Sequence, residues 1–177
     1  MNERKITLCG VKSEDFEEYY RIRSCKTDVY WNGYNSKPDK DQFRKIFKKR
    51  LATSPFIDDG DRRNYFVRIL RGNEEINIGF IQFINHKDSI EIGYTIIDEF
   101  QGMGLGTKAL ELALIKAKKF QKKIILRIRD DNIASQKIAK KNAFVSTNTF
   151  EVVKYENKNE EVILRTYKYY QKDKGVM

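Results

Sequence analysis

The sequence has very few of the residues from which metal sites, disulfide frameworks and membrane spans are built. His86 is the only histidine, and the only cysteines, Cys9 and Cys25, are far from any CxxC spacing. We therefore predict reduced, structural thiols and no metal site. No run approaches the roughly 18 apolar residues that a membrane span needs. The N-terminus carries charges where a signal peptide has its apolar region, so we expect a cytoplasmic protein.

Charge of one sign is in excess, but it does not select a partner. The chain has 35 Lys and Arg against 25 Asp and Glu, a net charge of +10. Such a charge attracts nucleic acid, an acidic surface or a multiply phosphorylated cofactor. Many of the lysines lie in stretches such as KIFKKR and IKAKKFQKK, which are typical of solvated helix faces.

The hydrophobic periodicity predicts a single domain spanning residues 1–177, with no linker and no internal repeat. In chain order, the expected elements are a strand at 6–8, a helix at 14–23 capped by Ser13, a helix at 39–52 capped by Asp39, strands at 64–70, 76–85 and 90–97, a helix from 105, a strand at 122–129, a helix at 131–142, and strands at 144–156 and 161–171. Short turns make the middle three strands an antiparallel meander, and the following strand, helix and strand favour a right-handed parallel crossover. The predicted class is α/β (α+β), a mixed, mostly antiparallel sheet of about seven strands flanked by about four helices.

A glycine-rich loop, QGMGLGTK at 101–108, lies between a predicted strand and a predicted helix. Its spacing does not fit the dinucleotide fingerprint GxGxxG, and GTK is not the GK[ST] of a Walker A loop. It does fit Q/R-x-x-G-x-G/A, with Gln101, Gly104 and Gly106. Glycines let the main chain approach a ligand, and the first N–H groups of a helix have no acceptor within it. We predict that the amides of about 102–107 bind a pyrophosphate; the alternative is a turn that only reverses the chain.

Two stretches together carry a resemblance to a known family. EIGYTIIDEFQGMGLGTKALELALIKA resembles the acetyl-CoA-binding segment of the GCN5-related N-acetyltransferase (GNAT) superfamily. NIASQKIAKKNAF resembles the following helix of that superfamily, NxxSxxhxxKxGF, through Asn132, Ser135, Ile138, Lys141 and Phe144. The order of the predicted elements is also the superfamily's order, so the resemblance covers nearly the whole chain and implies a GNAT fold.

Three positions depart from the pattern. Ala143 stands where the second motif usually has glycine, which suggests a different turn there, and Ala139 stands where many members have a tyrosine that protonates the departing thiolate. The first strand is similar to that of the subgroup that acetylates ribosomal-protein N-termini, but Cys9 replaces the usual arginine. These departures concern the substrate class and the general acid, and leave cofactor binding unaffected.

The resemblance implies direct attack of an amine on the thioester of acetyl-CoA, through a tetrahedral oxyanion, with CoA leaving as thiolate. In family members, the strand before the loop is splayed from its parallel neighbour. The resemblance implies that free backbone N–H groups of this strand stabilise the oxyanion. The implied acetyl-CoA contacts are Tyr94, Thr95, Ile96, Gln101, Gly102, Met103, Gly104, Leu105, Gly106, Thr107, Asn132 and Lys141. Asn132 either only caps its helix or also touches the cofactor. Arg127 and Arg129 are further candidates for the phosphates.

The predicted catalytic residues are Glu91 and Ser135. An alkyl amine has a pKa near ~10 and is mostly protonated at neutral pH, so the reaction needs a base. Glu91 interrupts an apolar alternation at 90, 92, 94 and 96, and it is either the base or an ordinary surface carboxylate. Ser135, with no tyrosine at 139, is either the acid or water holder for the leaving sulfur, or a first-turn residue that bonds to the backbone.

The acceptor is less constrained by the sequence. In the superfamily, the connection between the first two helices helps to wall the acceptor site, and here it reads DVYWNGYNSKPD. Tyr30, Trp31 and Tyr34 either contact the acceptor or pack as a lid, and Asp28 is placed to meet an ammonium group. The opening strand and the NxxS helix favour a protein or peptide N-terminus. The aromatic connection favours a small amine such as an amino sugar, polyamine or antibiotic.

Two other classes of function stay open at this point. Ala139 favours a CoA-binding module without catalysis, and the net charge alone favours a nucleic-acid-binding protein, although the sequence lacks a stripe of basic residues interleaved with aromatics. The C-terminal strands are also suited to pairing between two subunits, as a homodimer.

Overall fold

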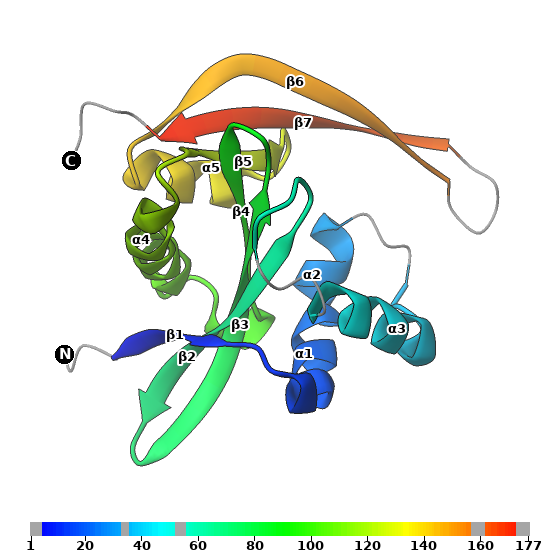
Figure 1. The fold of residues 1–177 in the computed structure, drawn as a ribbon, viewed down its shortest axis with the longest axis vertical. Coiled ribbons are helices and arrows are strands. Elements are labelled where there is room, and N and C mark those ends of the chain that lie inside the picture. Colours follow the sequence, from blue (N-terminus) through cyan, green and yellow to red (C-terminus); the bar gives the residue numbers. More distant parts are fainter. Residues whose placement is uncertain (1–4, 33–35, 52–55, 157–161, 173–177) are drawn as a thin grey trace.

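The structure is a computed structural model that describes residues 5–32, 36–51, 56–156 and 162–172. One sheet of seven strands runs through it in the order β1-β2-β3-β4-β5-β7-β6 (Figure 1). Neighbouring strands are antiparallel except β4 and β5, which are parallel. The strands are β1 (Ile6–Gly10), β2 (Arg62–Arg71), β3 (Glu74–Asn85), β4 (Ser89–Ile96), β5 (Lys123–Arg129), β6 (Phe144–Glu156) and β7 (Val162–Lys172). The predicted mixed, mostly antiparallel sheet with a parallel crossover is confirmed.

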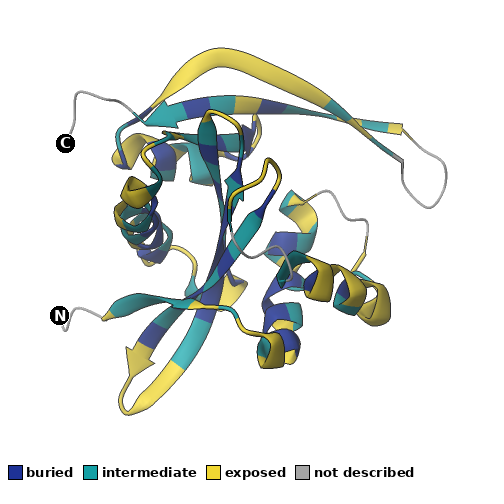
Figure 2. Ribbon diagram, viewed as in Figure 1, coloured by how far each residue is buried: buried dark blue, intermediate teal, exposed yellow. Residues whose placement is uncertain are grey.

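Helices cover both faces of this sheet (Figure 1). They are α1 (Phe16–Arg23), α2 (Lys26–Trp31), α3 (Lys40–Leu51), α4 (Leu105–Ala117) and α5 (Ile133–Lys141). α4 and α5 pack on one face, where Leu110 and Leu126 are fully buried, and α1 to α3 pack on the other, where Tyr19 and Phe80 are nearly so. Figure 2 shows this burial as dark blue segments in the central strands and in the inner sides of the helices. The alternation of each strand therefore divides its side chains between two separate cores.

The structure differs from the sequence prediction at two places near the N-terminus. α2 is a fifth helix, of six residues, within the stretch that the sequence predicts to be an irregular connection. Ser13 is not a helix cap. It opens a short 3-10 helix, and the backbone N–H of Lys12 donates instead to the carboxylate of Asp15 at 2.8 Å. Asp39 does cap α3, by accepting from the N–H of Gln42 at 2.8 Å.

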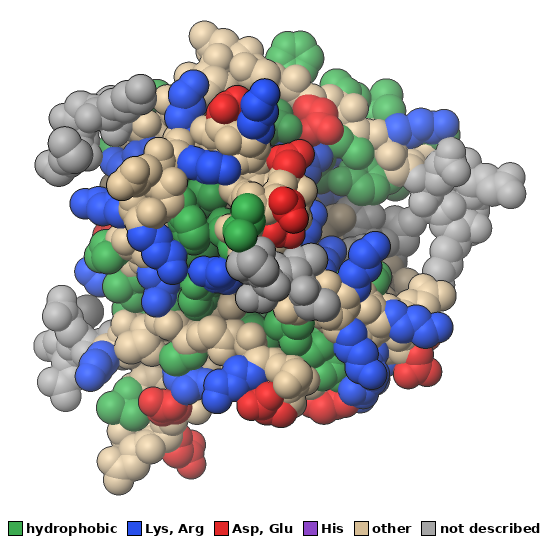
Figure 3. All heavy atoms as spheres, in the orientation of Figure 1, with side chains coloured by type: hydrophobic (Ala, Val, Ile, Leu, Met, Phe, Trp, Pro, Cys, Tyr) green, Lys and Arg blue, Asp and Glu red, His purple; other side chains and the backbone are tan. Residues whose placement is uncertain are grey.

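The basic residues are dispersed over the surface. Figure 3 shows Lys and Arg side chains spread over one face, with acidic groups between several of them. Cys9 and Cys25 are both free thiols, and Cys25 contributes to structure because its Sγ accepts from the N–H of Asp28 at 3.4 Å, at the start of α2. None of the helices in the described ranges is long and apolar enough to cross a bilayer.

Candidate functional site

The parallel strands β4 and β5 pair only at one end. Ser89, Ile90 and Glu91 pair with residues 123–125, and beyond Glu91 the two strands have no paired residues. A cleft of about 640 Å³ opens at this place. It is lined by residues from α2, the last turn of α1 and of α3, strands β2 to β7, the glycine-rich loop and α5. Separation of two neighbouring strands thus brings main-chain groups of β4, the loop and α5 to a common cavity.

The glycine-rich loop has the backbone conformation that its glycines allow. Gly102 and Gly104 have φ of +73° and +75°, a left-handed region that other residues enter at a cost. Gly104 is the residue before α4, and no side chain of the described residues caps the helix there. A Cβ atom at either glycine would meet nothing within 4 Å, and both residues line the cleft. The uncapped N–H groups at the start of α4 are therefore accessible to an anion in the cleft.

Gln101 fixes the loop against the rest of the site. Its Nε2 donates to the carbonyl oxygen of Ile96, at the end of β4, and to Oγ1 of Thr27 in α2, both at 2.8 Å. Gly106 has a different role, because a Cβ atom there would lie 2.9 Å from Cδ1 of Ile138 in α5. Gly102 and Gly104 thus leave open space at the cleft, and Gly106 allows α4 to pack closely against α5.

The structure brings nearly all of the predicted cofactor contacts together. The cleft is lined by Tyr94, Thr95, Ile96, Gln101, Gly102, Gly104, Leu105, Gly106, Thr107, Asn132 and Lys141. Met103 is outside this set and is about half exposed. Asn132 caps α5, because its Oδ1 accepts from the N–H of Ser135 at 3.0 Å, and it also lies in the cleft wall.

Glu91 lies in the cleft wall, on the other face of β4 from the buried Ile90 and Ile92, as the alternation predicts. Its side chain is only 16% exposed, and its Oε2 lies 3.2 Å from Nε2 of His86. The other ring nitrogen of His86 lies 3.6 Å from a carboxylate oxygen of Asp59. The carboxylate of Glu91 is therefore held in place beside the point where β4 and β5 part.

Tyr94 and Ser135 meet across the cleft. The hydroxyl of Tyr94 donates to the carbonyl oxygen of Ser135 at 3.2 Å. Burial raises the pKa of Tyr94 to about 12, so the phenol stays protonated at neutral pH and can donate this hydrogen bond. Ser135 lines the cleft, and in the described part of the chain its Oγ has no hydrogen-bond partner.

The predicted acceptor contacts are not all in the cleft. Trp31 lines it, whereas Asp28 and Tyr30 lie outside the set of described lining residues. Tyr30 is 52% exposed, and Asp28 is completely buried. Tyr34 lies outside the described residues. Of these four positions, only that of Trp31 is placed by the structure at the cavity.

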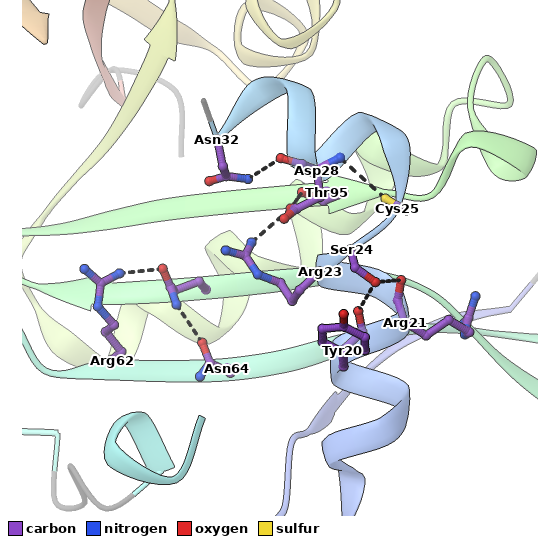
Figure 4. Close-up of polar contacts among 11 residues, drawn as sticks. Tyr20, Arg21, Arg23, Ser24, Cys25, Asp28, Asn32, Arg62, Asn64 and Thr95 are labelled. Atoms are coloured by element: carbon purple, nitrogen blue, oxygen red, sulfur yellow. Dashed lines mark hydrogen bonds and ion pairs between the residues drawn. The ribbon is translucent and has the colours of Figure 1, made fainter. Parts of the chain in front are cut away.

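Asp28 instead forms the centre of a buried polar network (Figure 4). Its Oδ1 accepts from Arg23 Nη1 at 2.9 Å and from Thr95 Oγ1 at 2.6 Å, and its carbonyl oxygen accepts from Asn32 at 2.8 Å. Burial raises the pKa of Asp28, against the opposing effect of Arg23. The network ties α1 and α2 to β4 behind the cleft wall.

Arg127 and Arg129 also line the cleft, but both have acidic partners. Arg127 Nε donates to Glu151 at 2.8 Å, and Arg129 forms two bonds with the carboxylate of Asp131. The guanidinium of Arg129 also lies 4.4 Å from the ring centroid of Trp31. This stacking and pairing hold the aromatic ring of α2 in the cleft wall.

The sequence prediction missed a polar row on β2 and β3. Arg62, Gln82 and Arg50 all line the cleft. Arg62 Nη1 donates to Gln82 Oε1 at 2.6 Å, and Gln82 Nε2 donates to Asn64 Oδ1 at 3.0 Å. One feature of the sequence does indicate this row. Arg62, Asn64 and Gln82 are polar positions in otherwise apolar strands. Only the register between the strands shows that they share a face with Glu91.

Comparison with known proteins agrees with this geometry. A family model described as the acetyltransferase (GNAT) domain matches residues 5–145. No curated protein sequence matches the chain. Among solved structures, the chain is similar to the spermidine N-acetyltransferase of Vibrio cholerae in complex with CoA and spermine, with 16% identity, a TM-score of 0.72, and coverage of 94% of this chain and 95% of that one.

Two further solved structures have the same fold. One is an acetyltransferase from Salmonella typhimurium that modifies the N-terminal serine of ribosomal protein L7/L12, with 17% identity, a TM-score of 0.69 and coverage of 94% of both chains. The other is a putative phosphinothricin N-acetyltransferase, with 16% identity, a TM-score of 0.72, and coverage of 96% of this chain and 98% of that one.

Proposed function

The chain belongs to the GNAT acetyltransferase family, and from this premise we propose that the cleft between β4 and β5 is its active site, with Glu91 as the base. The protein is an N-acetyltransferase that transfers an acetyl group from acetyl-CoA to a primary amine. The observation that carries the proposal is the cleft itself. The cleft holds the uncapped start of α4, the unpaired part of β4 and a half-buried carboxylate within one cavity.

The residues of the glycine-rich loop fit the pyrophosphate of acetyl-CoA. The N–H groups at the start of α4 have no acceptor in the helix and carry its positive dipole end. The open space beside Gly102 and Gly104 leaves room for a ligand against the main chain. Lys141 and Lys137 of α5 line the same cavity and add positive charge for the phosphates. When bound, acetyl-CoA supplies the thioester from which the acetyl group is transferred.

The unpaired part of β4 supplies further donors. β4 pairs with β3 along Ile90–Ile96, whereas on its other side it has no paired residue beyond Glu91. Main-chain groups between residues 92 and 96 that point toward β5 therefore have no strand partner there. We assign to them the binding of the ligand's amide groups and the stabilisation of negative charge that develops on the carbonyl oxygen.

Glu91 is the group that we assign to proton removal. It is the one carboxylate among the described residues that line the cleft. An amine must lose a proton to become a nucleophile at neutral pH, and a carboxylate within hydrogen-bond reach, directly or through water, accepts it. His86, whose Nε2 lies 3.2 Å from the carboxylate, orients it, and the His86 side chain is itself 38% exposed to solvent.

One hydroxyl group on the α5 side is placed to act on the leaving sulfur. We assign this role to Ser135, whose Oγ lies at the cleft without a described partner. The phenol of Tyr94, which its raised pKa keeps protonated, donates to the main-chain carbonyl oxygen of Ser135 and so holds the first turn of α5 at the cleft. Ala139, where many family members have a tyrosine, is completely buried and offers no polar group.

Incubation of the protein with acetyl-CoA and a panel of amines tests this function. We expect release of CoA thiol that depends on both an amine and the protein, together with an acetyl group added to the amine by mass. Binding of acetyl-CoA is measured separately by calorimetry. Saturable binding without transfer to any amine would contradict the catalytic assignment, and absence of binding would contradict the placement of the cofactor.

A further inference from the structure

Arg62 has a position that the proposed chemistry does not use. It lies at the first position of β2, it is half-buried, and its side chain lines the cleft. Its guanidinium donates to the neutral amide oxygen of Gln82 at 2.6 Å. Within the described ranges, no carboxylate lies within salt-bridge distance of Arg62, in contrast to Arg23, Arg127 and Arg129 in the same wall. An anionic partner offsets the cost of withdrawing a guanidinium from water.

The surroundings of Arg62 increase the need for such a partner. Burial lowers the pKa of Arg62, and the nearby positive charges of Arg50 and Arg23 lower it further, while Glu91 acts in the opposite direction. Arg50 and Arg23 line the same cavity. Figure 4 shows Arg23 below α2, and Arg62 farther along the strands, beside Asn64. Arg62 thus lies near two further guanidinium groups, of which that of Arg23 is paired with Asp28, and an anion bound at Arg62 would reduce the repulsion.

The strand register places Arg62 and Glu91 in one row of the sheet, two strands apart. Arg62 pairs with Ile84 of β3, and Ile84 pairs with Glu91 of β4, so the two charged residues occupy one row on one face of the sheet. With neighbouring strands about 4.8 Å apart, their backbones are about 10 Å apart. A small molecule in the cleft can therefore present one group to each of them.

The anion at Arg62 is not the pyrophosphate assigned to the loop. Ile96 lies five positions after Glu91 in the extended strand, which is a length of about 17 Å at about 3.4 Å per residue. The glycine-rich loop follows Ile96, whereas Arg62 lies in the row of Glu91, at the other end of β4. The two positively charged regions thus belong to opposite ends of the cleft.

We propose that the acceptor is a small amine that also carries an anionic oxygen group, such as the carboxylate of an amino acid, with its amine at Glu91 and its anion on Arg62. The inference rests on the proposed function of the same cleft. A planar guanidinium binds two carboxylate oxygens at once. A polyamine would instead place a second positive charge against this wall, where like charges repel.

A matched set of acceptors tests the inference. The probes are the twenty protein amino acids, each with its uncharged α-carboxamide, together with spermidine, and the assay is CoA-thiol release with mass detection of the acetylated product. We expect one or more free acids to exceed the paired carboxamide in kcat/KM by about 10-fold or more. Equal or higher values for the carboxamides, a preference for spermidine, or no acetylation of any free acid would overturn the inference. Acetyl-CoA binding, measured in parallel, shows whether the proposed function fails as well.

Variants at one strand position separate recognition from folding. Arg62→Gln should lower kcat/KM for the acid about 10- to 100-fold through KM, and leave the carboxamide and acetyl-CoA affinity nearly unchanged. Arg62→Lys, which keeps the charge, should recover part of the loss. Arg63→Gln is the control, because Arg63 is the next residue of β2, lies against Phe56 and is not among the described residues of the cleft wall. An equal loss on acid and carboxamide in Arg62→Gln would show a structural role and contradict the inference.

Discussion

A pair of glycine substitutions tests the anion site at the start of α4. Gly104 has φ of +75° and lines the cleft, and Gly72, in the turn between β2 and β3, has φ of +63° and lies outside the described wall of the cleft. A Cβ atom at either position would meet nothing within 4 Å. Gly104→Ala and Gly72→Ala therefore impose the same backbone strain, but only the first adds a methyl group where the ligand would lie.

The expected loss of stability is similar for both variants. A left-handed conformation costs an alanine about 1–2 kcal/mol, and the stiffer unfolded chain returns about 0.4–1 kcal/mol of it. The net destabilisation is about 1 kcal/mol, which lowers Tm by roughly 2–4 °C in a chain of this size. Thermal unfolding of the two variants measures this term.

The expected loss of affinity is not similar. If the methyl group at Gly104 removes one charge-assisted hydrogen bond between a main-chain N–H and a phosphate, the cost is about 1.5–3 kcal/mol, or a roughly 10- to 150-fold increase in the Kd of acetyl-CoA. Gly72→Ala should bind as the wild type does. Calorimetric titration with acetyl-CoA measures both. Wild-type affinity in Gly104→Ala, or an equal loss in Gly72→Ala, would refute the placement of the pyrophosphate.

Three further predictions concern other described features. Ala143 has φ of +56°, so Ala143→Gly should relieve strain and raise Tm by about 2 °C, as measured by calorimetry; a lower Tm would contradict this reading. Because the pKa of Tyr94 is raised to about 12, its contribution to stability is complete below pH 10 and is lost as the pH rises through 12. In an alkaline absorbance titration, Tyr94→Phe should therefore lack a component near pH 12. A titration unchanged from that of the wild type would contradict the raised pKa of Tyr94. Asp28→Asn removes the carboxylate that pairs with the buried Arg23 and should cost about 3–5 kcal/mol, whereas Glu17→Gln, at an exposed pair, should change Tm little. Equal Tm values in the two variants would show that the network does not stabilise the fold.

The sequence predicts the sheet and the loop well because both depend on local signals. The period of two in β2 to β4, the short turns between them and the glycine spacing at 101–106 are each visible in a few neighbouring residues. α2 was missed because it has only six residues, and its cap is the sulfur of Cys25, an uncommon capping group. Ser13 was chosen as a cap by residue type, whereas the carboxylate of Asp15 makes the bond.

The cleft was predicted in part. The alternation of β4 is enough to place Glu91 on the face away from Ile90, and the NxxS spacing is enough to place Asn132 and Ser135 together. The role of Arg62 depends instead on pairing across two strands, which includes a shift of register between Val67 and Arg68. No local pattern carries that information. The burial of Asp28 likewise depends on tertiary contacts, because its partners Arg23 and Thr95 belong to other elements.

Transfer kinetics of Glu91→Gln test the central claim most directly. The substitution keeps the shape of the side chain, removes its capacity to accept a proton at neutral pH, and leaves the start of α4 unchanged. We predict a fall in kcat of about 10²- to 10⁴-fold, with the Kd of acetyl-CoA and the Tm close to those of the wild type. A wild-type kcat in Glu91→Gln would contradict the account.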